Sequence, residues 1–232
     1  MKDPKIYLMK DPLLHADMLD SLNAGKATVV YSEDDGVMLK SGRDLYRIST
    51  ESEDTLRRLC KMIESDRDYD IVTHQFRLIS AIYEEKGLFD ILPCRQAVYR
   101  GEKLPEPEIP GIEFRPLTMD QLSFVTENYD SDERYIRKRI DEGMLGAFDG
   151  EKCVGFIGRH GDGSVGLLKV LPAYRRRGIG EGLESRMVNR VLDEGRVPYD
   201  HVVIGNDASM SLQKKLGMEF AKNMVVWLWK KD

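Results

Sequence analysis

A proline-rich segment near the middle of the chain limits, more than any other feature, how this sequence can fold. Residues 101–111 read Gly-Glu-Lys-Leu-Pro-Glu-Pro-Glu-Ile-Pro-Gly and hold three of the nine prolines. Because proline has no backbone N–H to donate, the segment forms neither a helix interior nor a central strand. We predict an extended linker at 101–111 that joins an α/β domain at 1–100 to a second one at 112–232.

The second half of the chain alternates strand and helix signals. Thr118 and Gln121 have the spacing of a capping box, and Asp149-Gly150 supplies the positive φ that a hairpin turn needs. An apolar residue at every fourth position from Ile179 to Val191 forms one helical stripe. The predicted strands are 112–115, 144–148, 152–159, 165–171, 199–204 and 225–229, and the predicted helices are 118–128, 131–142, 179–194 and 207–216.

The first half repeats part of this order. Asp11 as N-cap and Pro12 at the first helical position predict a helix that ends near Gly25. A shift of 130 residues aligns the halves with few identities, so the shared order of elements is the better evidence for a duplicated fold; two unrelated α/β halves are the alternative. The other predicted helices are 52–63 and 75–86, and the predicted strands are 27–31, 37–40, 45–48, 69–73 and 91–99.

Charge and cysteine content exclude several functional classes. A formal net charge of −5 gives no general attraction to nucleic acid or anionic lipid, so any anion site must be built locally. Cys60, Cys94 and Cys153 lie far apart, which argues against a disulfide framework or a zinc site, and we expect buried thiols and no metal. No stretch approaches the roughly 20 apolar residues of a membrane span. We therefore predict a cytoplasmic monomer or homodimer with no membrane or nucleic-acid partner.

A basic turn between a strand and a helix carries the strongest chemical signal. The apolar stretch before Pro172 runs into Arg-Arg-Arg-Gly-Ile-Gly at 175–180, and a helix follows. The two glycines let backbone N–H groups approach a ligand, the helix N-terminus adds partial positive charge, and the arginines bond phosphate oxygens. A polyphosphate fits best, although the spacing matches neither a P-loop nor the dinucleotide fingerprint. A solvated basic turn and a nucleic-acid contact are the plainer alternatives.

Arg175-x-x-Gly178-x-Gly180 after Val170-x-Pro172 resembles the acetyl-CoA pyrophosphate loop of the GNAT superfamily of N-acetyltransferases. Residues 206–218, Asn-Asp-Ala-Ser-Met-Ser-Leu-Gln-Lys-Lys-Leu-Gly-Met, resemble the second motif of that family. The resemblance implies a mixed-sheet α/β fold of GNAT type at 112–232. The two-half layout is similar to the glycine N-acyltransferase branch, with a degenerate GNAT-like copy at 1–100. Because Ser-Thr-Glu-Ser-Glu follows Ile48 in that copy, we expect one cofactor site per chain.

The resemblance also implies an activity and a set of site residues. The activity is transfer of an acetyl group from acetyl-CoA, or another acyl group from its CoA ester, to a primary amine of a small molecule or peptide by direct attack in a ternary complex. Strand backbone would pair with pantetheine, the basic turn would hold the pyrophosphate, and the second motif would line the opposite wall. The expected cofactor-binding residues are Leu168, Lys169, Val170, Arg175, Arg176, Arg177, Gly178, Ile179, Gly180, Asn206 and Ser209.

The acid and base are where this sequence departs from the family. The usual tyrosine of the second motif is Gln213, so the thiolate leaves unassisted or takes a proton from Ser209 or water. Residues 165–171 contain no acid, which makes His201 the candidate base, with a structural histidine or a water relay as alternatives. His160 reads as an exposed turn residue. These departures keep open a second function, a non-catalytic acyl-CoA binding or sensing module.

Two tyrosines, one between the predicted helices 118–128 and 131–142 and one near the start of the second, are further candidates. Tyr129 and Tyr135 lie where the family shapes its acceptor pocket, so the resemblance offers them as substrate contacts. Surface positions without a function are the plainer alternative.

Overall fold

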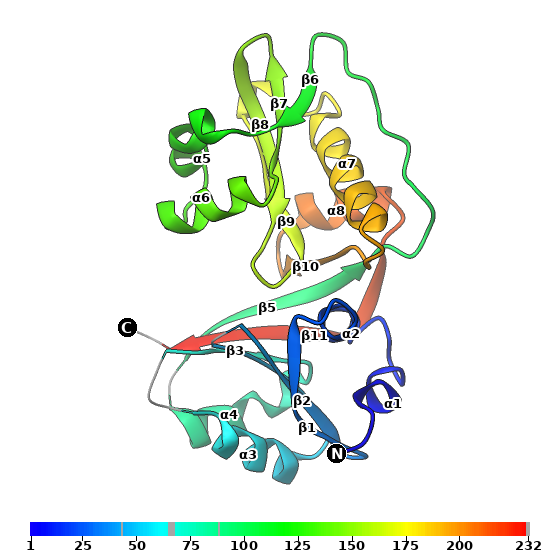
Figure 1. Cartoon of the computed structure of the whole chain (residues 1–232), viewed down its shortest axis with the longest axis vertical. Coiled ribbons are helices and arrows are strands. Elements are labelled where there is room, and N and C mark those ends of the chain that lie inside the picture. The colour runs from blue at the N-terminus through cyan, green and yellow to red at the C-terminus, as the bar shows by residue number, and fades with distance from the viewer. Residues whose placement is uncertain (43, 65–67, 88, 231–232) are drawn as a thin grey trace. The chain divides into compact units, whose positions relative to one another are not determined.

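The computed structural model describes residues 1–42, 44–64, 68–87 and 89–230, drawn as coloured ribbon in Figure 1. By internal contacts the chain forms two compact units. The first holds residues 1–98, 201–207 and the chain from 219 onward, and the second holds 99–200 and 208–218. The predicted domains at 1–100 and 112–232 follow the chain in order, whereas these units interleave.

The first unit begins with two helices that precede a three-stranded meander. Its seven-stranded sheet has the order β1-β2-β3-β4-β11-β5-β10. The elements of the first half are α1 (Pro4–Leu8), α2 (Ala16–Asn23), β1 (Ala27–Glu33), β2 (Gly36–Ser41), β3 (Leu45–Ser49), α3 (Glu53–Met62), β4 (Asp70–Thr73), the 3₁₀ turn η1 (Phe76–Leu78), α4 (Ile79–Lys86) and β5 (Phe89–Val98).

The second half repeats this order of two helices, three strands, and then helix, strand, helix and strand, after one additional strand. Its four-stranded antiparallel sheet has the order β6-β7-β8-β9 and lies between α5 and α6 on one side and α7 on the other (Figure 1). Its elements are β6 (Glu113–Pro116), η2 (Met119–Gln121), α5 (Leu122–Asn128), α6 (Glu133–Asp141), β7 (Leu145–Asp149), β8 (Lys152–Arg159), β9 (Val165–Val170), η3 (Pro172–Tyr174), α7 (Ile179–Asp193), β10 (Tyr199–Val203), α8 (Asp207–Lys215) and β11 (Glu219–Lys230).

Local signals place most of these elements correctly. The Thr118 and Gln121 capping box is present at the start of η2. Gly150 in the β7–β8 turn has φ +58°, which an L-residue with a side chain rarely adopts. The predicted stripe along α7 is buried, with Leu183 at 0% exposure, and packs against the β6–β9 sheet.

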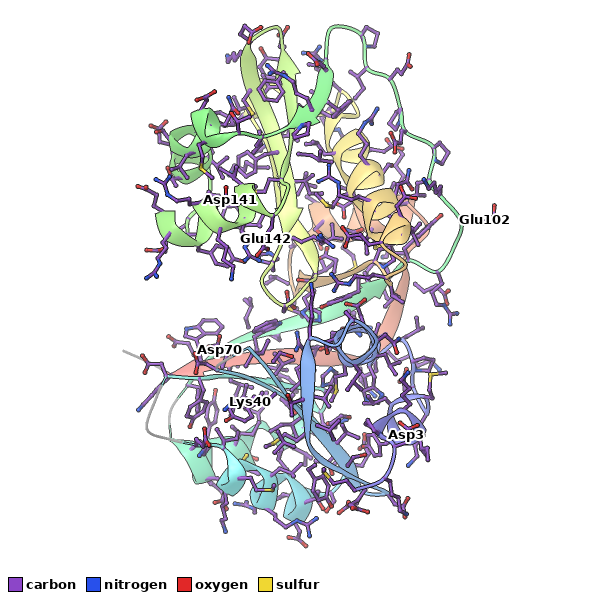
Figure 2. The ribbon with its side chains drawn as sticks, in the orientation of Figure 1. Asp3, Lys40, Asp70, Glu102, Asp141 and Glu142 are labelled. Atoms are coloured by element: carbon purple, nitrogen blue, oxygen red, sulfur yellow. The ribbon has the colours of Figure 1, made fainter. Side chains whose placement is uncertain are left out.

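The N-terminal helix prediction is wrong at its start. Asp11 accepts a hydrogen bond from Leu14 N at 3.1 Å, but residues 12–15 form turns and α2 begins only at Ala16. A separate helix, α1, precedes it and was not predicted. Its N-cap is Asp3, labelled in Figure 2, which accepts from Lys5 N at 2.9 Å. The Asp-Pro cap signal is therefore real at residue 3 and marks only a turn at residue 11.

Sequence patterns predict the last strand of the chain but not the sheet that it joins, and the structure shows it as β11. It runs antiparallel to both β4 and β5, with Val226 opposite Thr73 and Pro93. Val225, Val226 and Leu228 are fully buried. The predicted strand at 225–229 is confirmed and extends over 219–230, and it completes the sheet of the first unit rather than the sheet of the second.

The three cysteines are buried, as predicted, and none forms a disulfide. Burial raises the pKa of Cys60 to about 11. Among the residues that the structure describes, no helix is both long enough and apolar enough to cross a bilayer.

A buried charge cluster lies between α2 and the β3–β4 strands of the first unit. Asp17 Oδ2 lies 3.2 Å from Arg47 Nε, and Asp17 Oδ1 lies 2.8 Å from His74 Nε2, with all three side chains at 0% exposure. Burial alone would raise the pKa of Asp17, but the neighbouring His74 and Arg47 outweigh burial and lower it. The cluster fixes α2 on the sheet.

We expect Asp17→Asn to destabilise the protein by about 3 kcal/mol, because it removes the negative charge that pairs with the buried Arg47 guanidinium while that guanidinium remains. Urea denaturation at pH 7 measures this. The matched control is Asp34→Asn, which breaks the exposed Lys2–Asp34 pair and should cost less than about 1 kcal/mol. Equal costs for the two variants would contradict the role assigned to the cluster.

Candidate functional site

The turn that carries the basic motif has a backbone shaped by two left-handed residues. It leaves β9, passes through η3 and enters α7 at Ile179. Arg176 has φ +64° and Gly178, the N-cap of α7, has φ +83°. A non-glycine residue with positive φ is uncommon and is found mostly where the surrounding structure holds it. The turn is therefore tightly defined.

This conformation directs a run of backbone donors outward. In the described chain, the N–H groups of residues 176–181 donate to no recorded carbonyl, and the first bond of the helix runs from Gly182 N to Gly178 O at 2.9 Å. A helix N-terminus with unsatisfied N–H groups carries partial positive charge and attracts anions. The arrangement is that of an anion cradle.

The three arginines of the turn are exposed but differ in their contacts. Arg175 Nε donates to Val170 O at 3.1 Å, which ties the turn to the last residue of β9. The Arg177 guanidinium lies 5.3 Å from the ring centre of Tyr174. No contact is recorded for the Arg176 side chain within the described residues, so its guanidinium is available to a ligand.

Strand β9, which leads into the turn, is an edge strand of the second unit's sheet. It pairs with β8 on one side and ends the order β6-β7-β8-β9. Leu167 has φ +55°, and the β8–β9 register shifts by one residue there. Such a bulge turns backbone groups away from the ladder. An extended ligand can pair with the outer edge of this strand as an added strand does.

The corresponding place in the first half is closed. Strands β3 and β4 are paired in parallel from Leu45↔Asp70 to Ile48↔Thr73, so β3 has no open edge on that side. In the turn after β3, backbone N–H groups donate hydrogen bonds to side-chain oxygens of the protein itself. Thr50 N donates to Gln75 Oε1 at 2.9 Å, and Ser52 N donates to Thr50 Oγ1 at 3.1 Å. This copy therefore has neither an edge nor a cradle.

The second motif builds α8 and a buried contact to α7. Gln213, 1% exposed, donates from Nε2 to Asp200 Oδ2 at 3.0 Å and to Glu184 Oε1 at 3.2 Å. Its side chain is thus part of the interior. Ser209 belongs to the second unit and is half-buried. Asn206 belongs to the first unit and is exposed.

His201, the base predicted from the sequence, has both ring nitrogens engaged within the first unit. Trp227 Nε1 donates to His201 Nδ1 at 3.0 Å, and His201 Nε2 lies 2.8 Å from Gln96 Oε1. Since Nδ1 accepts, Nε2 carries the proton and donates to Gln96. The nitrogen lone pair is occupied, so these contacts favour the structural role over the base.

His160, read from the sequence as an exposed turn residue, is instead half-buried and hydrogen-bonded. Its Nδ1 lies 2.9 Å from the hydroxyl of Tyr135. Tyr135 and Tyr129 pack against the core cluster beneath α5 and α6, so they are not surface decoration. Sequence reasoning missed this pair because 25 residues separate its members and no motif links them.

The proline-rich segment is extended, as predicted, but it is bound along the whole of α7. Asn189 donates from Nδ2 to Leu104 O at 2.9 Å and accepts from Leu104 N at 2.8 Å. Near the helix C-terminus, Lys103 Nζ lies 2.6 Å from Asp193 Oδ1. At the other end, a Cβ placed on Gly178 would lie 3.5 Å from Ile109. We call residues 103–109 the strap.

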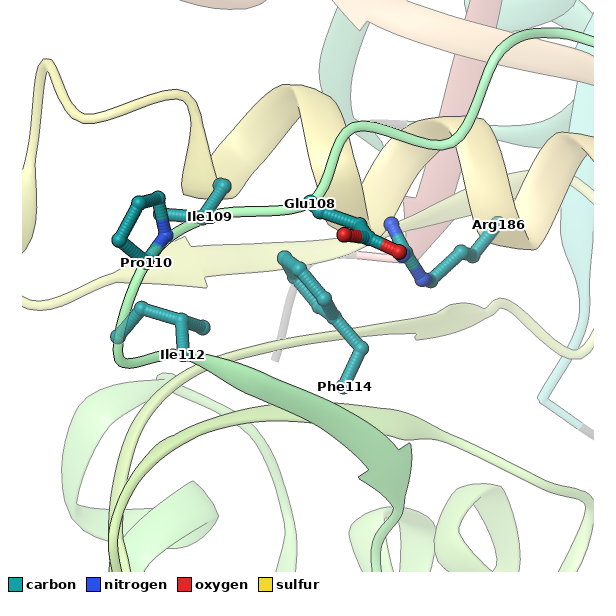
Figure 3. Close-up of a pocket in the computed structure, with 6 residues that line it drawn as sticks. All are labelled: Glu108, Ile109, Pro110, Ile112, Phe114 and Arg186. Carbon is teal, nitrogen blue, oxygen red and sulfur yellow. The ribbon is translucent and has the colours of Figure 1, made fainter.

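Beside the strap lies an open cavity of about 490 Å³, shown in Figure 3. Arg186 forms one wall, with its guanidinium 4.0 Å from the ring centre of Phe114 and one N–H donated to Pro107 O at 3.3 Å. These contacts satisfy Arg186 within the protein, so the cavity is a gap between the strap, α7 and β6 rather than a cluster of reactive groups. The lining residues are Glu108, Ile109, Pro110, Ile112, Phe114 and Arg186.

Comparison with known proteins gives the fold. Residues 144–228 match the family described as FR47-like protein. A Drosophila protein of known structure has a TM-score of 0.66, 16% identity, and coverage of 84% of this chain and 74% of that one. A putative GNAT-family acetyltransferase from Novosphingobium aromaticivorans has a TM-score of 0.57, 17% identity and full coverage of both chains. A GCN5-related N-acetyltransferase from Kribbella flavida has a TM-score of 0.57, 16% identity, and coverage of 94% and 96%. No curated protein matches.

The chain therefore has the GNAT fold, and the resemblance seen in its motifs is confirmed. The closer likeness to the glycine N-acyltransferase branch stays a prediction.

The carboxyl group of Glu184 gives the second unit a testable pH dependence. Burial raises the pKa of Glu184 to about 7 from an ordinary 4.5. Between these values the folded state holds a proton that the unfolded state has released, so stability falls as pH rises through this window. We expect Glu184→Gln to be more stable than the natural protein at pH 8, by at most about 3 kcal/mol, with little difference at pH 4.5. Urea midpoints at both pH values measure this, and a pH-independent difference would contradict it.

Proposed function

We propose that the chain is an acyl-CoA-dependent N-acetyltransferase that moves an acetyl group from acetyl-CoA to a primary amine. One observation carries the proposal: the turn from Arg175 to Gly180 presents unsatisfied N–H groups and an unengaged arginine at the N-terminus of α7. A diphosphate is the anion that fits several donors at once. The GNAT fold supports a CoA thioester as its carrier.

Nine of the eleven cofactor-binding residues proposed from the sequence belong to β9 or to the turn and helix start that follow it, and the other two, Asn206 and Ser209, belong to the second motif. Leu168, Lys169 and Val170 belong to the outer edge of β9, where backbone amides would pair with the amides of pantetheine. The turn would hold the pyrophosphate. A backbone N–H near Val170 would then polarise the thioester carbonyl as negative charge develops on its oxygen.

In this proposal the reaction proceeds by direct attack in a ternary complex. The amine nitrogen forms a bond to the thioester carbon, and no covalent enzyme intermediate is needed. The leaving sulfur needs little help, because a thiol of pKa about 8.5 leaves readily as thiolate near neutral pH. Ser209 remains our candidate for a proton donor to it, since Gln213 is committed to Glu184 and Asp200.

We propose one cofactor site per chain, in the second half. Pairing of β3 with β4 and the internally bonded turn at Thr50 support this, because they occupy the groups that a pantetheine and a diphosphate would need. The acceptor is proposed as an amine of a small molecule or peptide.

A second candidate function is non-catalytic acyl-CoA binding. Gln213 favours it, because the residue in the position of the usual tyrosine is buried and hydrogen-bonded within the protein. Both functions predict that CoA raises the melting temperature, since a ligand selective for the folded state stabilises it. Only the enzyme releases free thiol from acetyl-CoA in the presence of an amine.

We expect Arg176→Glu to weaken CoA binding at least tenfold, because it replaces a charge-assisted hydrogen bond with repulsion of the diphosphate. Thermal shift titration with CoA gives the affinity, and thiol release across a panel of amines gives the activity. The matched control is Arg77→Glu, which makes the same charge change at an arginine paired with Glu51 in the first unit. Unchanged CoA affinity in Arg176→Glu would refute the loop assignment.

A further inference from the structure

His160 lies directly against the strand that would bind pantetheine. It follows β8, and its ring covers Gly166 on β9. A Cβ built on Gly166 would lie 2.6 Å from both Nε2 and Cδ2 of His160. The ring therefore needs a glycine beneath it, and its Nε2 edge meets the backbone of β9.

The place on β9 that His160 covers is next to the bulge. Gly166 precedes Leu167, whose left-handed φ of +55° shifts the strand register. A ligand paired with β9 and anchored at residues 175–180 extends backward along the strand at about 3.3 Å per residue. In the proposed complex, the far end of the ligand, which carries the thioester, would lie along the stretch between Val170 and Gly166.

His160 also lies on the side of the sheet that α5 and α6 cover. Leu167 belongs to the core cluster with Tyr129 and Tyr135, whereas Leu168 and Val170 pack on the opposite side with α7. The ring thus stands on the α6 face of β9, at the level of the bulge.

The ring is oriented by one strong contact and keeps the other nitrogen available. Tyr135 Oη lies 2.9 Å from Nδ1. No hydrogen bond to Nε2 is recorded among the residues that the structure describes, and the side chain is only half-buried. In the tautomer whose Nδ1–H donates to Tyr135 Oη, the lone pair of Nε2 is directed at the β9 side.

The charges around His160 come from its own turn and from α6. Burial lowers the pKa of His160, Asp162 on the same turn opposes this shift, and Arg139 from α6 adds to it. Arg139 is itself paired with Glu142 at 3.0 Å and lies 5.1 Å from the Tyr135 ring centre. The lowered pKa favours the neutral imidazole, which is the form that can accept a proton.

We propose that His160 is the general base of the acetyl transfer, positioned by Tyr135. This inference rests on the proposed function. The acceptor enters as an ammonium ion, and Nε2 takes one of its protons. The freed nitrogen lone pair forms the N–C bond, the carbonyl electrons move to oxygen and return, and the C–S bond breaks with its pair on sulfur. The second proton of the nitrogen passes to the thiolate or to solvent, and His160 releases its proton to solvent.

The test is the pH dependence of thiol release in His160→Gln, with acetyl-CoA and the best amine saturating. We expect the rate at pH 7 to fall by about 100-fold, the lower range for loss of a general base. We also expect its pH profile to change form. The natural enzyme should reach a plateau above the pKa of its base, whereas the variant should keep rising toward the pKa of the free amine. A CoA affinity within twofold of that of the natural protein, measured by thermal shift titration, verifies that the variant is folded.

Two further variants separate catalysis from packing. Tyr135→Phe keeps the ring but removes the hydroxyl, so it should lower the rate several-fold and displace the acidic limb of the profile. Gly166→Ala should push the imidazole off β9 and also lower the rate, while CoA binding persists. If Tyr135→Phe, which lacks the hydroxyl, keeps the rate and pH profile of the natural protein, the positioning role of Tyr135 is contradicted.

The outcomes distinguish failure of this inference from failure of the proposed function on which it rests. No thiol release by the natural protein with any amine, with or without CoA binding, overturns the proposed function and this inference together. Turnover by the natural protein with an unchanged rate and profile in His160→Gln overturns only the inference. If His201→Gln instead abolishes the pH-dependent limb, the base is the residue predicted from the sequence and His160 is structural.

Discussion

Hydrogen bonding along one side of the third strand of each half separates a copy that can take an extended ligand from one that cannot. In the first half, β3 uses that side to pair with β4 from Leu45↔Asp70 to Ile48↔Thr73. In the second half, β9 ends its sheet and is further distorted by the bulge at Leu167. An edge strand with unpaired groups is a liability unless something covers it. Here the proposed carrier is what covers it, so the same fold has one sealed copy and one open copy.

The chemistry of the site depends on where its polar groups are already satisfied. Gln213 Nε2, both ring nitrogens of His201 and the Arg186 guanidinium are engaged by the protein, so these side chains stabilise the fold. Arg176 and His160 retain unengaged nitrogen atoms beside β9 and its turn. Arg176 is exposed, so water can solvate it, whereas His160 is half-buried, and an unengaged nitrogen on a half-buried ring is informative about a ligand.

Local rules were sufficient for most elements and insufficient for their partners. The capping box at Thr118, the Gly150 turn and the α7 stripe depend on residues within four positions of one another, so sequence spacing predicts them. The pairing of β11 with β4 and β5 spans more than 120 residues, and no local signal encodes it. The same limit applies to the site: the basic turn was recognised from its spacing, whereas Tyr135 and His160 meet only through tertiary packing.

Because β11 lies between β4 and β5, the sheet of the first unit can be completed only late in synthesis. The ribosome makes those two neighbours long before residues 219–230 emerge, and until then each presents a bare apolar edge. A nascent chain in that condition is vulnerable to mispairing with another copy. A premature stop between residues 101 and 218 would leave the sheet of the N-terminal half permanently incomplete, even though every residue of that half had been translated.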